Sequence, residues 1–280
     1  MATTINTNMS SLMAQRALGA SQGSLSTSMQ RLSTGLRINS AKDDSAGLAI
    51  AERMTSQVKG MAVASRNAND AISLAQTAEG ALGKIGESLQ RMRELAVQSS
   101  NSTNSTSDRA NLNEEYTALA AEVTRVIDGT KFNGNNLLNT DTGMAFQVGA
   151  DAVATDAITV NLTDISGGTG MALVLDTAGT TGSISTAAVA LATMSNLDAA
   201  IDEVTSARSN LGSVQNRFES VVANLATTSE NLQAAKGRIL DADFAVETSN
   251  MSRAQVLQQA GNAMLAQANQ APQQVMSLLR

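Results

Sequence analysis

Hydrophobic residues recur at alternating intervals of three and four along most of the chain, which is the spacing of helices with one buried stripe. The members of the first run are Leu18, Leu25, Met29, Leu32 and Leu36, and Gly35 together with Asn39-Ser40 ends it. A second run extends from about Ala46 to Gln98. As one helix it would be roughly 75–80 Å long at 1.5 Å per residue, which is too long for a compact domain.

Three further runs follow the same spacing. After a turn at residues 101–107, the third run covers residues 112–126, and the fourth keeps one heptad seam over residues 197–232. The fifth run covers residues 253–279, where Pro272 should kink or fray the last turns. Three polar residues interrupt the fourth seam and are expected to set its register: Arg208, Gln215 and Ser229.

The middle of the chain changes from helical to strand-like spacing. Hydrophobic residues alternate with polar ones over residues 144–148 and 158–162, with residues 149–156 between them. This pattern predicts a β-hairpin. Beyond it, residues 166–186 are rich in Gly and Thr around Met171–Leu175, which indicates a short outer loop or a small strand pair, too short to be a domain.

Long helices with narrow apolar seams cannot each bury a full core, so they must pack on one another and on copies of themselves. An aromatic content of 2% also disfavours a compact globule or a ligand pocket. The predicted fold class is therefore mainly α: an elongated, self-associating bundle of long helices with a small β-hairpin region.

The residue types that are missing restrict the chemistry. The chain has no Cys and no His, so the usual transition-metal ligand sets and the Ser-His-Asp and Cys-His catalytic arrangements cannot form. Carboxylate-only sites remain open. Five Asp residues without any Lys or Arg lie between Phe132 and Leu197, but no Asp-x-Asp-x-Asp-Gly loop supports a cation site. We therefore expect no enzyme, no cofactor and no metal.

Charge and polarity restrict the kinds of partner that this chain can bind. A net charge of −6 disfavours nucleic acid. Residues 254–279 carry no charge, but their nine side-chain amides would each need a partner in lipid, so no membrane insertion is expected. Residues 1–30 have neither a basic start nor an apolar core of the kind found in a Sec-type signal peptide, so export would need another route.

Four segments carry a specific resemblance. They are RLSTGLRINSAKDDSAGLAIA at 31–51, QRMRELAVQ at 90–98, GRILDADFAVETSNMSRAQ at 237–255 and LAQANQ at 265–270. The first and third resemble the N-terminal and C-terminal signatures of bacterial flagellins, and the likeness covers about residues 1–150 and 195–280. Motifs of this length at both ends, in this order, are highly specific.

The resemblance implies three domains. Residues 1–44 and 237–280 would pair as a terminal coiled coil in the filament core, and residues 45–165 and 190–236 would form a helical rod with the hairpin. Residues 166–189 would be a short, surface-exposed variable insert. The chain would then be a subunit of the extracellular flagellar filament for swimming motility, secreted unfolded by the flagellar type III apparatus.

The same resemblance implies partners and site residues. Besides copies of itself, these partners are an export chaperone at the C-terminus, the filament cap, hook-associated proteins and the host receptor Toll-like receptor 5. The expected receptor contacts are Arg91, Leu95 and Glu115. The expected filament-assembly residues lie on two narrow seams that can pair with each other within one chain: Leu18, Leu25, Met29, Leu32 and Leu36, with Leu257, Met264, Val275 and Leu278.

Three alternatives remain at this point. A hook–filament junction protein of the same family shares the terminal signatures in weaker form. An enzyme with a catalytic insertion in the middle of the chain would need more than about 25 residues there. A secreted coiled-coil adhesin or translocator would need a segment compatible with a membrane.

Overall fold

The computed structural model describes residues 7–151, 153–176 and 182–278, and only the backbone of residues 154 and 271–278. It divides into two compact units. Unit 1 falls within residues 1–56 and 230–280, and unit 2 within residues 57–229.

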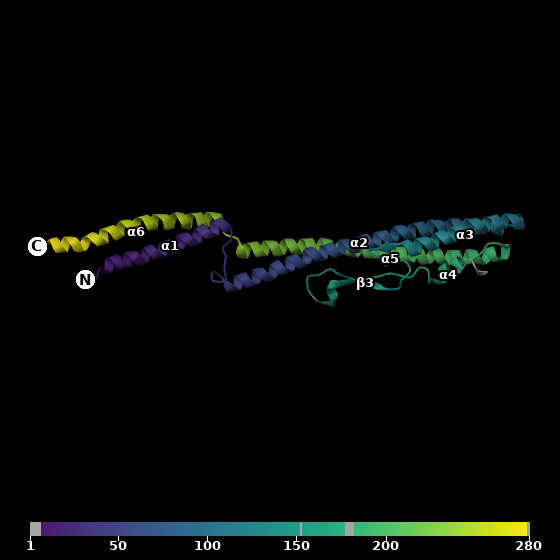
Figure 1. Cartoon of the computed structure of the whole chain (residues 1–280), viewed down its shortest axis with the longest axis horizontal. Coiled ribbons are helices and arrows are strands. Elements are labelled where there is room, and N and C mark those ends of the chain that lie inside the picture. Colours follow the sequence, from purple (N-terminus) through teal and green to yellow (C-terminus); the bar gives the residue numbers. More distant parts are fainter. Residues whose placement is uncertain (1–6, 152, 177–181, 279–280) are drawn as a thin grey trace. The chain divides into compact units, whose positions relative to one another are not determined.

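Helices dominate the described chain (Figure 1). They are α1 (Met9–Thr34), α2 (Ser45–Ser100), α3 (Thr106–Gly129), α4 (Thr169–Leu175), α5 (Ala187–Leu240) and α6 (Phe244–Leu278). The strands are β1 (Lys131–Phe132), β2 (Asn135–Asn136), β3 (Gly143–Gln147) and β4 (Ala157–Asn161), with a 3-10 turn η1 (Ala154–Asp156). The predicted mainly α class with a small β region is confirmed.

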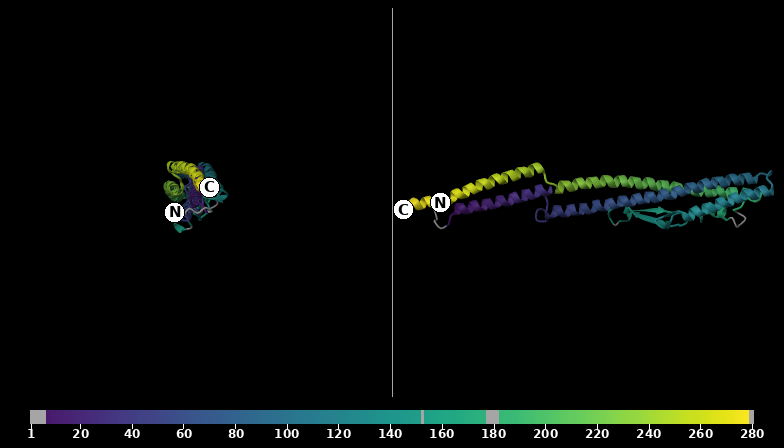
Figure 2. Two further views of the ribbon diagram at one scale, coloured as in Figure 1. Left: turned by 90° about the vertical axis from the view of Figure 1, so that its left-hand side faces the viewer. Right: turned by 45° about the horizontal axis from the view of Figure 1, so that its top comes forward.

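In unit 1, α1 and α6 lie side by side and antiparallel (Figure 2). The prediction that the terminal helices pair is therefore confirmed. The helix α1 begins where the side chain of Asn8 accepts a hydrogen bond from the Ser11 amide at 3.1 Å, an N-cap that satisfies one of the free donors of the first turn. It ends at Gly35, whose φ of 72° is a conformation that glycine adopts most readily.

The core of unit 2 begins on α2 as a seam of alanines and continues as a seam of larger side chains. Ala64, Ala68, Ala71, Ala75 and Ala78 are all buried at spacings of four and three. Because their side chains are small, other segments can approach the α2 backbone closely here. Further along, the second predicted run has its buried stripe at spacings of three and four: Leu82, Ile85, Leu89, Met92 and Ala96 are at most 1% exposed.

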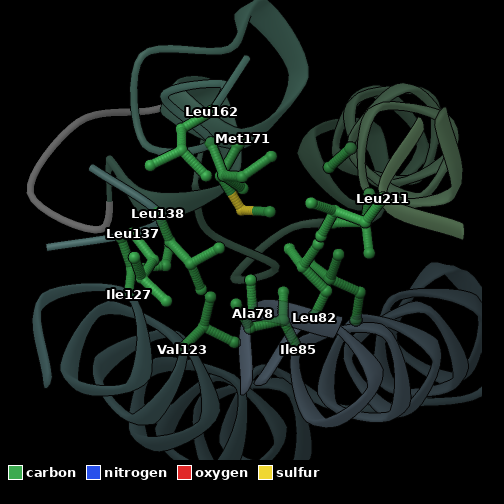
Figure 3. Close-up of a cluster of buried hydrophobic side chains, with 14 of the residues drawn as sticks. Ala78, Leu82, Ile85, Val123, Ile127, Leu137, Leu138, Leu162, Met171 and Leu211 are labelled. Carbon is green, nitrogen blue, oxygen red and sulfur yellow. The ribbon is translucent and has the colours of Figure 1, made fainter. Parts of the chain in front are cut away.

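Several segments meet on this core (Figure 3). Val123 and Ile127 come from α3, Leu137 and Leu138 follow β2, and Leu211 comes from α5. The fourth predicted seam also faces inward, since Leu197 and Phe218 are fully buried. Two of its polar interruptions contact one acceptor on α2: Gln215 donates to Glu79 at 2.9 Å and Arg208 lies 3.8 Å from it.

The predicted β-hairpin is present as β3 and β4. Its register pairs Gly143 with Asn161 and Gln147 with Ala157. Ile158 and Val160 are buried on one face, as period-two alternation requires. This sheet packs on α5 through the rings of Phe146 and Phe218, whose centroids are 5.9 Å apart at an interplanar angle of 83°.

The expectation of a loop or strand pair around Met171–Leu175 is wrong, because this segment is the helix α4. Its first amides are capped from α5: Glu203 accepts from the amides of Gly170 at 2.9 Å and Met171 at 3.2 Å. The approach is close, since a Cβ at Gly170 would lie 2.5 Å from the amide nitrogen of Ala200. Met171 and Val174 are fully buried, so this segment contributes to the core of unit 2 (Figure 3).

We expect Leu82→Ala to lower the free energy of unfolding of unit 2 by about 2–5 kcal/mol, because it leaves a cavity in a packed core. Tyr116 is the single tyrosine of a chain without tryptophan and is fully buried in this core, so its fluorescence in a urea titration reports on unit 2. The control is Val97→Ala, which truncates a side chain that is 46% exposed on the same helix. Equal losses of unfolding free energy in the two variants would contradict the assignment of Leu82 to the core.

Candidate functional site

The two signature segments meet at the end of α1. The amide of Arg37 donates to the carbonyl of Leu240 at 2.6 Å, and the amide of Ala242 donates to the carbonyl of Gly35 at 2.9 Å. Leu36 and Asp241 thereby form an isolated antiparallel bridge. The guanidinium of Arg37 adds a hydrogen bond of 2.7 Å to the carbonyl of Ile239. Residues about 200 positions apart in sequence are thus joined through backbone groups.

The loop between α1 and α2 is fixed by two neighbouring carboxylates. Asp43 accepts hydrogen bonds from the amides of Asn39 and Ser40 at 3.0 and 2.9 Å, and these bonds lower the pKa of its carboxyl group below the ordinary value. Asp44 accepts from the amide of Gly47 at 2.8 Å and so caps α2. Within the Lys-Asp-Asp-Ser stretch of the N-terminal signature, Asp43 therefore closes the turn that follows α1 and Asp44 caps the start of α2.

The contact face between α1 and α6 is made largely of small and polar side chains. On α1, Ser11 and Ser28 are buried and share a heptad face with the half-buried Leu18, Leu25 and Leu32. On α6 the corresponding face has Glu247 and Ala254 buried and the other residues half-buried, and it consists of Glu247, Met251, Ala254, Gln258, Gly261, Leu265 and Ala268. Leu18 contacts the backbone of Gly261, since a Cβ there would lie 3.9 Å from that of Leu18.

Polar contacts fix the register at both ends of this pair. Glu247 is 6% exposed and accepts a hydrogen bond of 2.6 Å from the hydroxyl of Ser28, and Arg31 lies 3.7 Å from its other oxygen. At the far end, the amide group of Asn8 donates to the carbonyl of Ala268 at 2.7 Å, and the hydroxyl of Ser11 donates to Asn269 at 2.9 Å. A shift by one turn would leave Glu247 buried without these partners, which is costly.

The structure separates the predicted assembly residues into two groups. Leu18, Leu25 and Leu32 lie on the face toward α6, and Leu36 lies in the backbone bridge. The other described members are exposed, at 50% for Met29, 52% for Leu257 and 64% for Met264. Val275 and Leu278 lie on α6, with side chains outside the described set.

The expected pairing of the two leucine seams is therefore wrong on the α6 side. Leu257 and Met264 flank the face that carries Ala254 and Gly261 and are more than half exposed. Small residues at Ala254 and Gly261 permit the close approach of the two helices, and Met251 and Leu265 are the larger apolar residues that α6 contributes to the contact. The apolar seam of α6 is left on the surface of unit 1.

A groove of about 690 Å³ lies beside this contact, between α1 and α6. Small and hydroxyl side chains of α1 line one wall, among them Gly23, Ser24 and Thr27. Asn250, Arg253 and Leu257 line the other. Unit 1 thus combines exposed apolar side chains with a hollow lined by hydrogen-bonding groups.

The residues of the expected receptor patch lie in unit 2. Arg91 forms ion pairs of 2.8 Å with Glu115 on α3 and with Glu94 one turn along α2, and these partners raise the pKa of its guanidinium group. Leu95, the third predicted receptor contact, is 1% exposed and lies in the hydrophobic core of unit 2. Arg91 and Glu115 are at the surface, and Leu95 belongs to the core beneath them.

Sites of other kinds are absent from the described part of the chain. Among those residues, His, Cys, Asp and Glu nowhere gather in a group of three or more that could hold a metal ion. Within the same ranges, each helix is too short or too polar to cross a lipid bilayer.

Comparison with known proteins agrees with these features. Residues 5–141 match the family described as bacterial flagellin N-terminal helical region, and residues 194–279 match the bacterial flagellin C-terminal helical region. The chain is 45% identical to a flagellin of Halalkalibacterium halodurans over 99% of both chains. It belongs to the bacterial flagellin family. A flagellin of Xenorhabdus nematophila is 47% identical over the full length of both chains.

Solved structures support the same family. The chain resembles the crystal structure of Bacillus cereus flagellin with a TM-score of 0.50 and 32% identity, over 61% of this chain and 94% of that one. A flagellar hook-associated protein from Vibrio parahaemolyticus has a TM-score of 0.59 over 71% of this chain and 100% of that one, but at 15% identity it shares the fold alone. This flagellin is a structural subunit of the flagellar filament, and nothing favours the hook–filament junction alternative.

The register of unit 1 can be tested by a disulfide, because this flagellin has no cysteine of its own. We expect the double variant Leu18→Cys/Gly261→Cys to close an intramolecular disulfide readily, since the Cβ separation of 3.9 Å matches disulfide geometry. The matched control is Leu18→Cys/Leu257→Cys, in which Leu257 lies one turn from Gly261 and is 52% exposed, and it should remain reduced under the same mild oxidation. Mass spectrometry of non-reduced peptides measures both, and preferential closure of the control would show a different register.

Proposed function

We propose that the exposed apolar side chains of unit 1 form the contacts between neighbouring subunits of the filament. The observation that carries this proposal is the exposure of Leu257 and Met264, at 52% and 64%, on a helix whose other side packs on α1. Leu257 also forms part of one wall of the groove between α1 and α6.

Exposed large hydrophobic residues support this assignment. Most of those with the highest exposure lie in unit 1 and include Met9, Met13, Phe244, Val246, Val256, Leu257 and Met264, each more than half exposed. This concentration of exposed apolar side chains in one unit favours interaction with other proteins there. Burying one such side chain contributes about 1.5–3 kcal/mol, so a few of them account for stable association.

We expect the double variant Leu257→Asp/Met264→Asp to raise the critical concentration for polymerisation at least about tenfold, because every 1.4 kcal/mol lost from a contact weakens it tenfold. Sedimentation of seeded filaments measures the subunit that remains in solution.

The control exchanges the two residues, as Leu257→Met/Met264→Leu, and keeps the apolar surface while changing its shape slightly. It should polymerise near the level of the unmodified chain. Tyrosine fluorescence confirms that unit 2 is folded in both variants. If the aspartate variant polymerises at the same critical concentration as the unmodified chain, the contacts between subunits lie elsewhere.

Three domain roles follow from this proposal. Residues 1–44 and 237–280 form the filament core, residues 45–165 and 190–236 form the rod, and residues 166–189 form a reduced variable insert. The burial of Met171, Val174 and Ile184 makes part of this insert a packed element of the rod. The chain acts without catalysis, in keeping with its structural family.

The partners of export and assembly belong to the same proposal. The flagellar type III apparatus secretes the chain unfolded, an export chaperone covers the C-terminal segment, and the filament cap and hook-associated proteins contact the ends of the polymer. The uncharged residues 254–279 and the exposed seam of α6 support a covering chaperone, since such a surface invites association before assembly.

A second proposal concerns Toll-like receptor 5, with Arg91 and Glu115 as contacts. It is supported by their ion pair of 2.8 Å, which brings together two charged side chains from α2 and α3, each about half exposed. Leu95 takes part only by supporting α2 from the core.

We expect Arg91→Ala in the monomer to reduce receptor signalling while the urea midpoint of unit 2 changes little, because exposed ion pairs contribute ~0–1 kcal/mol. The matched control is Arg125→Ala, which removes another exposed arginine that is paired with Glu122 in the same unit. A cell reporter assay measures signalling. Full signalling by the Arg91 variant would contradict the receptor proposal.

A further inference from the structure

The methionines of this chain are distributed unevenly between the two units. The sequence has 13 methionines, one tyrosine, no cysteine and no tryptophan. Among the methionines whose side chains the structure describes, four are at least half exposed: Met9 at 59%, Met13 at 67%, Met29 at 50% and Met264 at 64%. All four lie in unit 1, whereas Met92 and Met171 of unit 2 are fully buried.

We propose that these four methionines, which we call the exposed methionine set, are oxidation sites through which peroxide blocks self-association of the subunit. The proposal rests on the function assigned above to the surface of unit 1. It adds a chemical modification, its sites and its effect on assembly.

The chemistry needs only a peroxide that reaches the sulfur. A lone pair of the thioether attacks one oxygen of hydrogen peroxide, the O–O bond breaks, and a new S–O bond forms. The departing hydroxide takes the proton of the transferred hydroxyl group and leaves as water. Sulfur loses two electrons and the peroxide gains them, so the products are methionine sulfoxide and water.

Exposure decides which sulfurs react first. The exposed methionine set is open to solvent, while the core of unit 2 surrounds Met92 and Met171. No cysteine or tryptophan competes for the oxidant, and the single tyrosine, Tyr116, is fully buried. Peroxide should therefore modify unit 1 and leave the core of unit 2 unchanged.

Oxidation to sulfoxide makes the apolar surface of unit 1 more polar, which opposes its burial between subunits. Methionine is flexible and polarisable and fits irregular apolar contacts, which suits a surface that packs against other copies. A sulfoxide is polar and must keep a hydrogen-bond partner, so its burial between subunits is unfavourable. Exposed sulfoxides on the monomer remain solvated, so the fold of the monomer is little affected.

The experiment treats purified monomer with hydrogen peroxide and maps the sulfoxides by peptide mass spectrometry. We expect the exposed methionine set to react at least about tenfold faster than Met92 and Met171, following exposure. Seeded polymerisation of the same samples should show a critical concentration that is raised at least roughly tenfold. Tyrosine fluorescence should give an unchanged urea midpoint for unit 2.

The matched control replaces the exposed methionine set by leucine, as Met9→Leu, Met13→Leu, Met29→Leu and Met264→Leu. Leucine keeps the apolar surface and cannot be oxidised, so this variant should polymerise equally well before and after peroxide. Treatment of the oxidised unmodified chain with methionine sulfoxide reductases should restore its polymerisation. If the leucine variant does not assemble before oxidation, this reductase rescue decides the question.

Three results would overturn the proposal: equal oxidation of exposed and buried methionines, normal assembly of the fully oxidised chain, or equal loss of assembly in the leucine variant. Failure of the assembly function is distinguishable, because Leu257→Asp/Met264→Asp would then polymerise normally as well. If that aspartate variant fails to assemble and the oxidised chain assembles, the surface is an interface and oxidation does not control it.

Discussion

The pairing of α1 with α6 through small and polar side chains is the contact on which the behaviour of the chain ends depends. Ala254, Gly261 and the hydrogen-bonded Ser28 and Glu247 let the two helices approach closely and in one register. Leu18, Leu25 and Leu32 add half-buried apolar side chains to the same contact. Leu257 and Met264 of α6 are more than half exposed and lie outside it. One helix pair thus provides both an internal register and apolar side chains on its surface.

The backbone bridge between Leu36 and Asp241 explains why the two signature segments occur together. Neither segment can form this bridge alone, since each supplies one side of the hydrogen bonds. Gly35 turns the chain at the end of α1, Arg37 reaches the carbonyl of Ile239, and Asp43 with Asp44 then starts α2. The charged residues of the signature therefore serve turns and caps, and none of these roles requires chemistry of a catalytic kind.

Hydrophobic spacing predicts the long helices of unit 2, their inward seams and the β-hairpin, because in each of them a buried stripe recurs with the period of the element. The same reasoning failed on α6, where periodicity reveals a stripe but not whether the partner lies in the same chain. It also missed the burial of Leu95, since α2 is covered on more than one side and a single seam describes only one of them. The local sequence does not predict α4, because Glu203, which accepts hydrogen bonds from its first amides, lies more than 30 residues along the chain. A cap supplied by a distant helix leaves no signal in the neighbouring sequence.

The run of alanines along α2 has a mechanical consequence. Alanine has no side-chain rotamers, so a contact built from Ala64, Ala68, Ala71, Ala75 and Ala78 has no side-chain torsions through which to yield under load. Load on this contact therefore cannot relax through changes of side-chain rotamer. A core of larger, flexible side chains would absorb part of such a load by shifting its side chains between conformations. In a filament subunit, contacts of this kind favour stiffness along the helix.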